Sequence, residues 1–243
     1  MEHDDLTTGR LLTRREALVL IGAAGLGLLG RGAAAQDQAP LPKGVLPCVA
    51  RPQQMEGPFF VDTGLNRSDI RSDPATGAVR PGVPLQLTFR VSRVDGGCAP
   101  LPGAHVELWQ CDAAGVYSGV RDGSSDATGQ KFLRGYQVTD GAGNARFTTI
   151  YPGAYSGRTV HLHFMIRAAG SSGRREQFTS QLYFDDELTD RVLAQAPYRP
   201  RPPGTPRNAG DGLYRRGGSQ LLLAVKEQGK GYASTFDIGL QPA

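Results

Sequence analysis

Apolar and polar positions alternate along several stretches of this chain, as they do in half-buried β-strands. The clearest stretches are residues 83–94 (VPLQLTFRVSRV) and 104–111 (AHVELWQC). Short runs of β-branched and apolar residues predict further strands at residues 132–138, 145–150, 160–166, 178–184, 221–225 and 233–240. These strands predict an all-β fold: a single β-sandwich of mostly antiparallel strands, prealbumin- or Ig-like, with long active-site loops.

Helical character is confined to one short segment, residues 185–194 (DDELTDRVLA). Two acids stand at its start, where the helix dipole favours negative charge. No long amphipathic pattern and no internal repeat is present, so we expect at most short helices.

The composition agrees with a fold that has many turns. The chain of 243 residues contains 33 glycines and 17 prolines, and only 7% of its residues are aromatic. This length suffices for one well-buried domain and is too short for two large ones. The net charge of +4 is modest, and no stripe of Lys and Arg carries interleaved aromatics. We therefore expect no nucleic-acid partner.

Residues 1–35 are typical of an export signal. Arg14 and Arg15 precede a Gly-rich apolar run at residues 17–29, and residues 33–35 (AAA) match a small-residue cleavage site. The run is too short for a spanning helix. The paired arginines favour twin-arginine export over an ordinary Sec signal or a retained anchor. We expect a mature domain of residues 36–243, periplasmic or extracellular, with no stable membrane insertion after signal removal.

Three cysteines remain in the expected mature domain: Cys48, Cys98 and Cys111. In an oxidising compartment, one disulfide and one free thiol are the default. The predicted strand before Cys111 spans ~23 Å at ~3.3 Å per residue. That length argues against a bond from Cys98 to Cys111, because bridged Cα atoms lie within ~7 Å. We expect Cys48 to pair with one of the other two and favour Cys111.

The stretch at residues 160–166 (VHLHFMI) carries two of the four histidines in the chain. On a strand, His161 and His163 point to the same face, while Val160, Leu162 and Phe164 point the other way, into a core. Two neighbouring imidazoles on a rigid strand form a metal chelate. The alternative is a pair of polar residues on a solvated strand face.

Five ordered blocks of sequence carry a family resemblance: residues 56–60 (EGPFF), 106–118 (VELWQCDAAGVYS), 147–155 (FTTIYPGAY), 158–164 (RTVHLHF) and 181–184 (QLYF). Together they resemble the intradiol ring-cleavage dioxygenases, non-haem ferric enzymes that open catechol rings between the two hydroxyls. The chain is most similar to the exported, single-domain branch of that family. The resemblance implies a β-sandwich domain over residues 36–243.

The resemblance also implies a ferric site with four protein ligands: Tyr117, Tyr155, His161 and His163. Ferric iron is a hard ion that suits anionic oxygen and imidazole ligands. Arg158 matches the family's active-site arginine, and Gln181 matches a polar residue at the pocket. We expect Tyr155 to be the ligand that leaves the iron and acts as a base. The implied partners are a catechol and O2, and the implied product is a muconate-type diacid.

Several alternatives stay open at the level of sequence. Tyr151 competes with Tyr155, which we favour because of its Pro-Gly-x-Tyr context. An exported β-sandwich ligand- or carbohydrate-binding module would use the same side chains on a surface. A zinc hydrolase would need a third ligand beside the histidines, such as Glu107 or Asp112. His105 we expect at the surface.

The identity of the catechol and the oligomeric state do not follow from the sequence. The loops at residues 120–130 and 197–211 are the expected readers of ring substituents. In the second loop, Arg199, Arg201 or Arg207 could hold a carboxylate, although a solvated loop accounts for them equally well.

Overall fold

A computed structural model describes residues 48–95, 97–122, 125–170 and 175–240. The expected export signal at residues 1–35 lies outside these residues. Among the helices described, none is long and apolar enough to cross a membrane.

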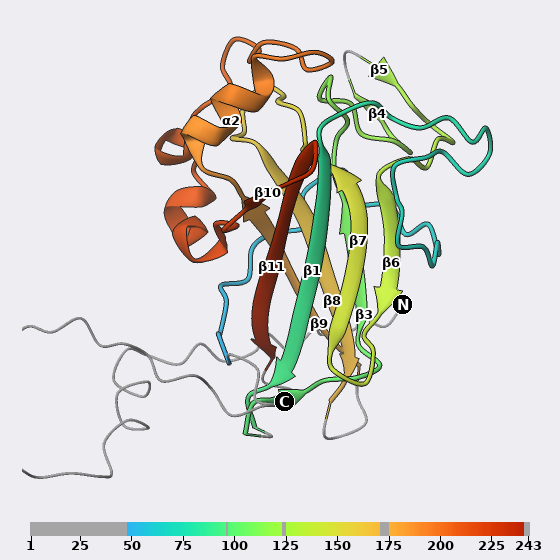
Figure 1. The fold of residues 1–243 in the computed structure, drawn as a ribbon, viewed down its shortest axis with the longest axis vertical. Coiled ribbons are helices and arrows are strands. Elements are labelled where there is room, and N and C mark those ends of the chain that lie inside the picture. Colours follow the sequence, from blue (N-terminus) through green and yellow to red (C-terminus); the bar gives the residue numbers. More distant parts are fainter. Residues whose placement is uncertain (1–47, 96, 123–124, 171–174, 241–243) are drawn as a thin grey trace, which may run out of the picture. The chain divides into compact units, whose positions relative to one another are not determined.

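Two sheets face each other and form a sandwich (Figure 1). The first sheet contains β10 (Lys226–Gln228), β11 (Gly231–Leu240), β1 (Pro84–Arg93) and β2 (Ala99–Pro100) in this order, with β7 (Asn144–Ile150) also paired to β1. The second sheet has the order β6 (Arg134–Val138), β3 (His105–Trp109), β8 (His161–Ala169) and β9 (Arg175–Tyr183). A small hairpin joins β4 (Arg121–Asp122) to β5 (Ser125–Asp126). The pair of β1 and β11 is parallel and the other strand pairs are antiparallel. The predicted sandwich is confirmed.

The core lies between the two sheets because each strand turns its alternate apolar residues inward. Phe89 of β1 shows this most clearly, since its ring meets Phe164 of the facing sheet at a centroid distance of 5.2 Å. Phe147 and Phe236 pack against the same ring at 6.0 Å each. Burying a side chain of this size stabilises the fold by about 1.5–3 kcal/mol.

The predicted short helix is present as α2 (Asp186–Leu193). Asp185 is its N-cap, and its carboxylate accepts hydrogen bonds from the backbone N–H groups of Glu187 and Leu188 at 3.0 and 2.9 Å. Such a cap satisfies donors that have no partner within the helix. Three short 3-10 helices follow: η1 (Asn208–Gly210), η2 (Tyr214–Arg216) and η3 (Gly218–Leu221).

The strand predicted at residues 221–225 is wrong. Leu221 ends η3, and β10 begins only at Lys226. Leu221 and Leu223 are buried while Leu222 is 38% exposed. Burial therefore alternates as in a strand, but the continuous ladder of inter-strand backbone hydrogen bonds of a sheet is not formed. One bridge from Leu222 to Tyr183 is all the sheet pairing this segment has in the described structure.

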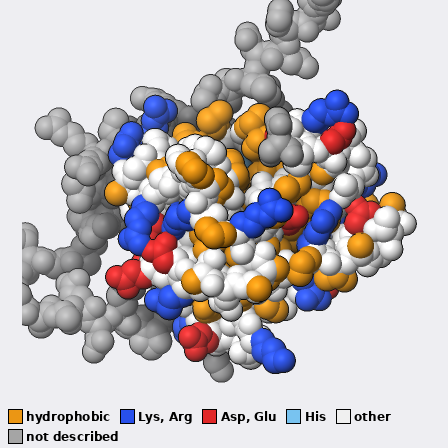
Figure 2. Space-filling view, turned by 90° about the horizontal axis from the view of Figure 1, so that it is seen from above, with side chains coloured by type: hydrophobic (Ala, Val, Ile, Leu, Met, Phe, Trp, Pro, Cys, Tyr) orange, Lys and Arg blue, Asp and Glu red, His pale blue; other side chains and the backbone are white. Residues whose placement is uncertain are grey.

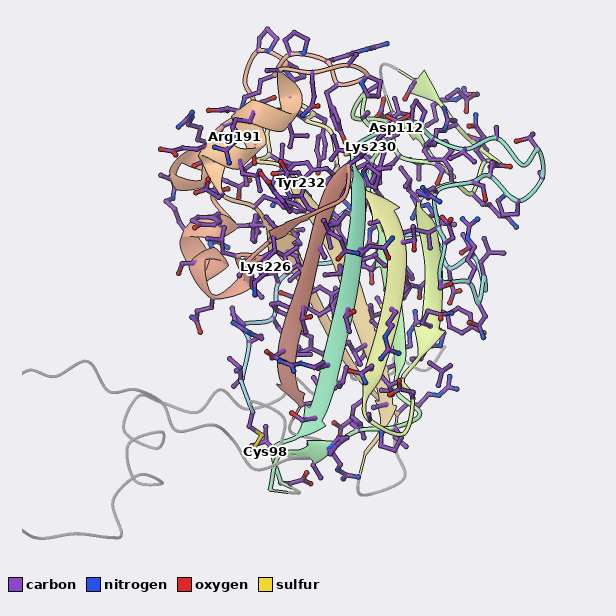
Figure 3. All side chains as sticks on the ribbon, viewed as in Figure 1. Cys98, Asp112, Arg191, Lys226, Lys230 and Tyr232 are labelled. Atoms are coloured by element: carbon purple, nitrogen blue, oxygen red, sulfur yellow. A yellow bond between two sulfur atoms is a disulfide. The ribbon has the colours of Figure 1, made fainter. Side chains whose placement is uncertain are left out.

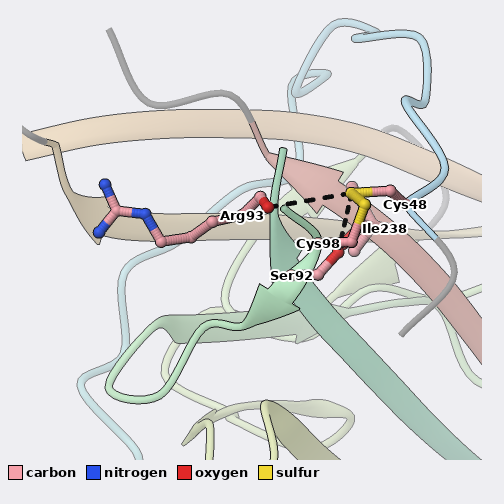
Figure 4. The surroundings of a disulfide bond; sticks show 5 residues. All are labelled: Cys48, Ser92, Arg93, Cys98 and Ile238. Carbon is pink, nitrogen blue, oxygen red and sulfur yellow. Dashed lines mark hydrogen bonds between the residues drawn. A yellow bond between two sulfur atoms is a disulfide. The ribbon is translucent and has the colours of Figure 1, made fainter. Parts of the chain in front are cut away.

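The preference for a bond between Cys48 and Cys111 is also wrong. Cys48 is bonded to Cys98, with their Cα atoms 5.2 Å apart, and Cys111 is free and buried. Figure 4 shows the bond beside Ser92 and Arg93, at the end of β1. Cys111 follows β3, which returns to the opposite end of the sandwich. Figure 3 shows this separation, with Cys98 at one end and Asp112 at the other.

Candidate metal centre

The start of β8 places the two histidines on one face of the strand, as the two-residue period of a strand requires. His161 and His163 share a face and are buried, and their Nε2 atoms lie 3.0 Å apart. The Nδ1 atom of His161 lies 2.6 Å from the carbonyl oxygen of Thr159. A carbonyl only accepts, so Nδ1 carries the proton and the Nε2 lone pair faces its neighbours. The other face of the strand buries Leu162 and Phe164 in the core, as predicted.

Two tyrosines reach the same place from two loops. The hydroxyl of Tyr155 lies 3.1 Å from Nε2 of His161. The Tyr117 ring lies edge-on to Tyr155 at 5.7 Å and to His163 at 6.1 Å between centroids. Tyr117 is fully buried, and its hydroxyl has no hydrogen-bond partner in the part of the chain that the structure describes.

Glycines allow the two tyrosine loops to touch. A Cβ on Gly153 would lie 2.5 Å from the carbonyl oxygen of Asp112, and one on Gly115 would lie 2.4 Å from that of Ala154. Gly115 also has a φ of +85°, which disfavours any other residue. The blocks AAGVY and PGAY therefore bring their tyrosines together because their glycines let the backbones pack.

Tyr151, the competitor of Tyr155, points elsewhere. Its hydroxyl lies 2.7 Å from that of Thr189 on α2. Its ring packs on Phe184 at a centroid distance of 4.2 Å. The structure thus brings Tyr155, and not Tyr151, to the histidine pair.

Burial keeps all four donors neutral in the protein alone. Desolvation raises the pKa of Tyr117 well above its ordinary value, and the nearby Tyr155 adds to this shift. It raises the pKa of Tyr155 as well. Desolvation and the charge of Arg158 lower the pKa of His161 to about 3, and desolvation holds that of His163 well below its ordinary value. A cation among these groups would reverse the preference of the phenols, because it stabilises phenolate.

Arg158 and Gln181 lie at the same site, in a network that the sequence did not predict. An Nη2–H of Arg158 donates to Oε1 of Gln181 at 2.6 Å, and Nη1 lies 3.5 Å from Nε2 of His161. Nε–H of Arg158 donates to the carboxylate of Asp211 at 2.8 Å. Asp211 is buried and also accepts from the backbone N–H of Thr159 at 2.9 Å. Asp211 follows a Pro/Arg-rich loop, and no local sequence motif indicates that it belongs to the site.

A cavity of about 580 Å³ opens beside these groups. Its walls come from the segment around the Gly-Pro-Phe block, from the site and from the turn after Asp211: Met55, Gly57, Pro58, Phe59, Tyr155, Arg158, His163, Gly212, Leu213 and Arg216. Figure 2 shows the end of the molecule that is uppermost in Figure 1, where basic and hydrophobic side chains lie next to one another. The described residues of 120–130 and 197–211 do not line the cavity, contrary to the expectation for substrate readers.

The other candidates from the sequence lie outside the site. Glu107 forms an ion pair with Arg167 at 3.0 Å, and the Asp112 carboxylate accepts from two backbone N–H groups of its own loop. His105 is half-buried and stacks on Tyr136 at 3.8 Å, so the expectation of a surface residue holds only in part. No group of three His, Cys, Asp or Glu residues suited to a metal occurs within the described ranges.

Comparison with known proteins agrees with the geometry. A family model described as a dioxygenase matches residues 55–242. The chain is 34% identical over 181 residues to the protocatechuate 3,4-dioxygenase beta chain of Burkholderia cepacia, covering 70% of this chain and 71% of that one. The chain belongs to the intradiol ring-cleavage dioxygenase family.

Solved structures of intradiol dioxygenases show the same fold. An intradiol ring-cleavage dioxygenase from Tetranychus urticae is 29% identical, with a TM-score of 0.68 over 80% of this chain and 96% of that chain. The dioxygenase domain of a carbohydrate-binding fusion protein from Streptomyces sp. SirexAA-E is 34% identical, with a TM-score of 0.59 over 80% and 100%. Enzymes of the intradiol family typically use non-haem Fe(III).

Proposed function

We propose that this protein is a non-haem Fe(III) intradiol dioxygenase that cleaves a catechol-type ring with O2 to a muconate-type diacid. One observation carries the proposal: two phenol oxygens and two imidazole nitrogens converge at one buried point beside a cavity. The Tyr117 hydroxyl there is buried without a partner in the described structure. A buried hydroxyl without a hydrogen bond costs about 1–3 kcal/mol, and a metal ion would give it a partner.

The donor set fits ferric iron. The residues that would hold the ion are Tyr117, Tyr155, His161 and His163. Two phenolates offset part of its charge in a site from which burial excludes other counter-ions. When bound, a ferric ion would supply Lewis acidity toward the catechol oxygens and activate the ring toward O2.

The two tyrosines differ in access, which assigns them different parts in the reaction. Tyr155 lines the cavity and is half-buried, whereas Tyr117 is sealed beneath Phe59, with stacked centroids 4.5 Å apart. A catechol entering the cavity meets Tyr155 first. As a phenolate, Tyr155 would accept a phenolic proton from the substrate and swing aside, while Tyr117 stays in place.

Arg158 would bind the substrate and balance charge. It lines the cavity, and its guanidinium is held by Asp211 on one side and by Gln181 on the other. Fixed in this way, it would stabilise negative charge that develops on the catecholate ring. Gln181 would keep the guanidinium in place and is itself tied to the backbone oxygen of Met55 at 3.1 Å.

Export fits the covalent structure. We propose that residues 1–35 are a twin-arginine-type signal and that residues 36–243 form the mature enzyme in the periplasm or outside the cell. The bond from Cys48 to Cys98 supports this proposal, because stable disulfides belong to oxidising compartments.

The binding-module alternative predicts that these side chains line an exposed surface. Instead His161, His163 and Tyr117 are at most 2% exposed. Buried titratable groups of this kind favour a metal centre over a sugar- or peptide-binding face.

The decisive experiment is a visible absorption spectrum of the purified, iron-loaded protein, before and after anaerobic addition of catechol. We expect a red-brown band from tyrosinate ligands and a shift when catechol binds. The matched pair Tyr117→Phe and Tyr151→Phe tests the assignment: the first should change the band, the second should leave it. A folded protein that takes up no iron would overturn the proposal.

A further inference from the structure

The cavity beside the candidate metal centre is lined by a second arginine, Arg216, in addition to Arg158, to which the proposed reaction assigns a role. Two of its lining residues have charged side chains, Arg158 and Arg216, and no carboxylate is among the lining residues. The charge of Arg158 is offset by its ion pair with the buried Asp211 at 2.8 Å. The backbone N–H of Arg216 donates to the carbonyl oxygen of Leu213 at 3.0 Å, but its guanidinium forms no hydrogen bond or ion pair with any described residue. Its charge therefore stands uncompensated at the cavity.

The backbone of Arg216 is fixed relative to the site. Arg216 ends the 3-10 turn η2, and Asp211 caps this turn by accepting from the backbone N–H groups of Leu213 and Tyr214 at 2.8 and 2.9 Å. Gly217 follows with a φ of +101° and packs against Pro52, where a Cβ would lie 3.1 Å from the proline ring. The same carboxylate thus positions Arg158 and the turn that presents Arg216.

The two arginines lie at different depths. Arg158 reaches to 3.5 Å from the buried His161, whereas Arg216 is exposed and so stands at the solvent side. The lining also includes the apolar residues Pro58, Phe59 and Leu213. A volume of about 580 Å³ exceeds what one dihydroxybenzene ring fills. A ring held by its hydroxyls at the inner end leaves room for a substituent directed toward Arg216.

We propose that Arg216 binds an anionic substituent, such as a carboxylate, on the ring of the substrate. The inference rests on the proposed function and adds the substrate class: catechols that carry an acidic group on the side opposite the hydroxyls. The arginines considered from the sequence do not serve this role, because none of Arg199, Arg201 and Arg207 lines the cavity. Arg201 and Arg207 pair with Asp190 instead.

The test compares Arg216→Gln with the matched control Arg215→Gln, whose side chain is exposed and lies outside the cavity lining. The substrates are catechol and 3,4-dihydroxybenzoate, with kcat/KM measured from O2 uptake by the iron-loaded protein. A charge-assisted hydrogen bond corresponds to a factor of about 10–100. We expect Arg216→Gln to lower kcat/KM for 3,4-dihydroxybenzoate by that factor and to leave catechol within about twofold.

A second readout does not depend on turnover. Anaerobic titration, followed by the visible band, gives the dissociation constant of each catechol. We expect Arg216→Gln to weaken 3,4-dihydroxybenzoate alone, and Arg215→Gln to weaken neither. If Arg216→Gln changes the dissociation constants of both catechols equally, or changes neither, the proposed role of Arg216 is wrong. Ring cleavage by the unmodified protein would still support the proposed function in that case. If the unmodified protein binds and opens neither catechol, the proposed function fails and this inference with it.

Discussion

The two faces of β8 differ in what surrounds them. One face buries Leu162, Phe164 and Ile166 in the apolar core between the sheets. The other face carries His163 and Met165 into a second cluster, which includes Trp109 and Tyr117. The first face joins the apolar core, whereas the second combines aromatic rings with polar atoms.

Unsatisfied polar atoms mark the second face. Buried atoms without a partner among the described residues include the Tyr117 hydroxyl, Nδ1 of His163, Nε1 of Trp109 and Nη1 of Arg134. Native proteins rarely leave such groups unpaired, because each costs about 1–3 kcal/mol. Trp109 Nε1 and Arg134 Nη1 only donate hydrogen bonds, so of these atoms a metal ion would serve the Tyr117 oxygen. One strand therefore supports an apolar core on one face and, on the other, the buried polar groups of the candidate metal centre.

The largest expected effect is loss of the metal from the site face. In His163→Ala we expect iron affinity to fall roughly 100-fold or more, and ring cleavage to disappear with it. Iron should raise the Tm of the unmodified protein and leave that of the variant unchanged, since ligands stabilise the state that binds them. Iron analysis and thermal unfolding check both points. His105→Ala, a histidine outside the site, is the control; iron retained in His163→Ala would contradict the assignment.

Substitutions on the core face of β8 should lower the stability of the fold and leave iron binding unchanged. Phe164→Ala removes a ring that packs on Phe89 and Phe236, and we expect it to lower the free energy of unfolding by about 3–5 kcal/mol. Denaturant titration of the iron-free protein measures this loss. The folded fraction should still take up iron with an unchanged absorption band. A changed band would show that the two faces are not independent.

A smaller effect is expected from Asp211, which we regard as a positioning residue for Arg158. Asp211→Asn keeps the shape and removes the charge that holds the guanidinium. We expect kcat/KM to fall about 10–100-fold, the worth of one charge-assisted hydrogen bond, with the iron band retained. Asp190→Asn removes an ion-paired carboxylate outside the cavity and should stay within about twofold. Equal effects of the two variants would refute the positioning role.

The smallest effect concerns Glu107, a buried carboxylate on β3. It is paired with Met165 of β8, so it lies on the same side of the sheet as the candidate metal centre. Desolvation outweighs the attraction of Arg167 and raises the pKa of Glu107 to about 7 from an ordinary value near 4.5. The folded state therefore binds the proton more tightly than the unfolded state, and this group lowers stability as the pH rises from about 4.5 to about 7. In Glu107→Gln we expect that decline to shrink by roughly 1–3 kcal/mol. The measurement is the free energy of unfolding of both proteins across this pH range. Parallel pH profiles for the unmodified protein and Glu107→Gln would contradict the raised pKa of Glu107.

The sequence predicted most of the fold because strand period is a local property. Alternation along residues 83–94 and 160–166 gave β1 and β8, and it also gave the opposite directions of His161 and Leu162. It failed at residues 221–225, where alternating burial arises from irregular packing of Leu221 and Leu223 and not from a ladder. Periodicity reports which side chains are buried, and the backbone partners must come from elsewhere in the chain.

The candidate site divides in the same way. The family resemblance of short sequence blocks pointed to Tyr117, Tyr155, His161 and His163 as candidate ligands, and each lies in a block whose glycines or strand period fix its direction. Asp211 stayed hidden because its partner Arg158 is 53 residues away in the chain, and no local pattern encodes that distance.

The sequence alone therefore determined the class of fold, the family resemblance and the candidate donor residues, all of which depend on residues close together in the chain. The tertiary structure decided which cysteines meet, which tyrosine faces the histidines and which segments enclose the cavity. Cys48 pairs with Cys98 because β1 and β3 run to opposite ends of the sandwich. These outcomes depend on how distant segments pack, and packing is a property of the whole chain.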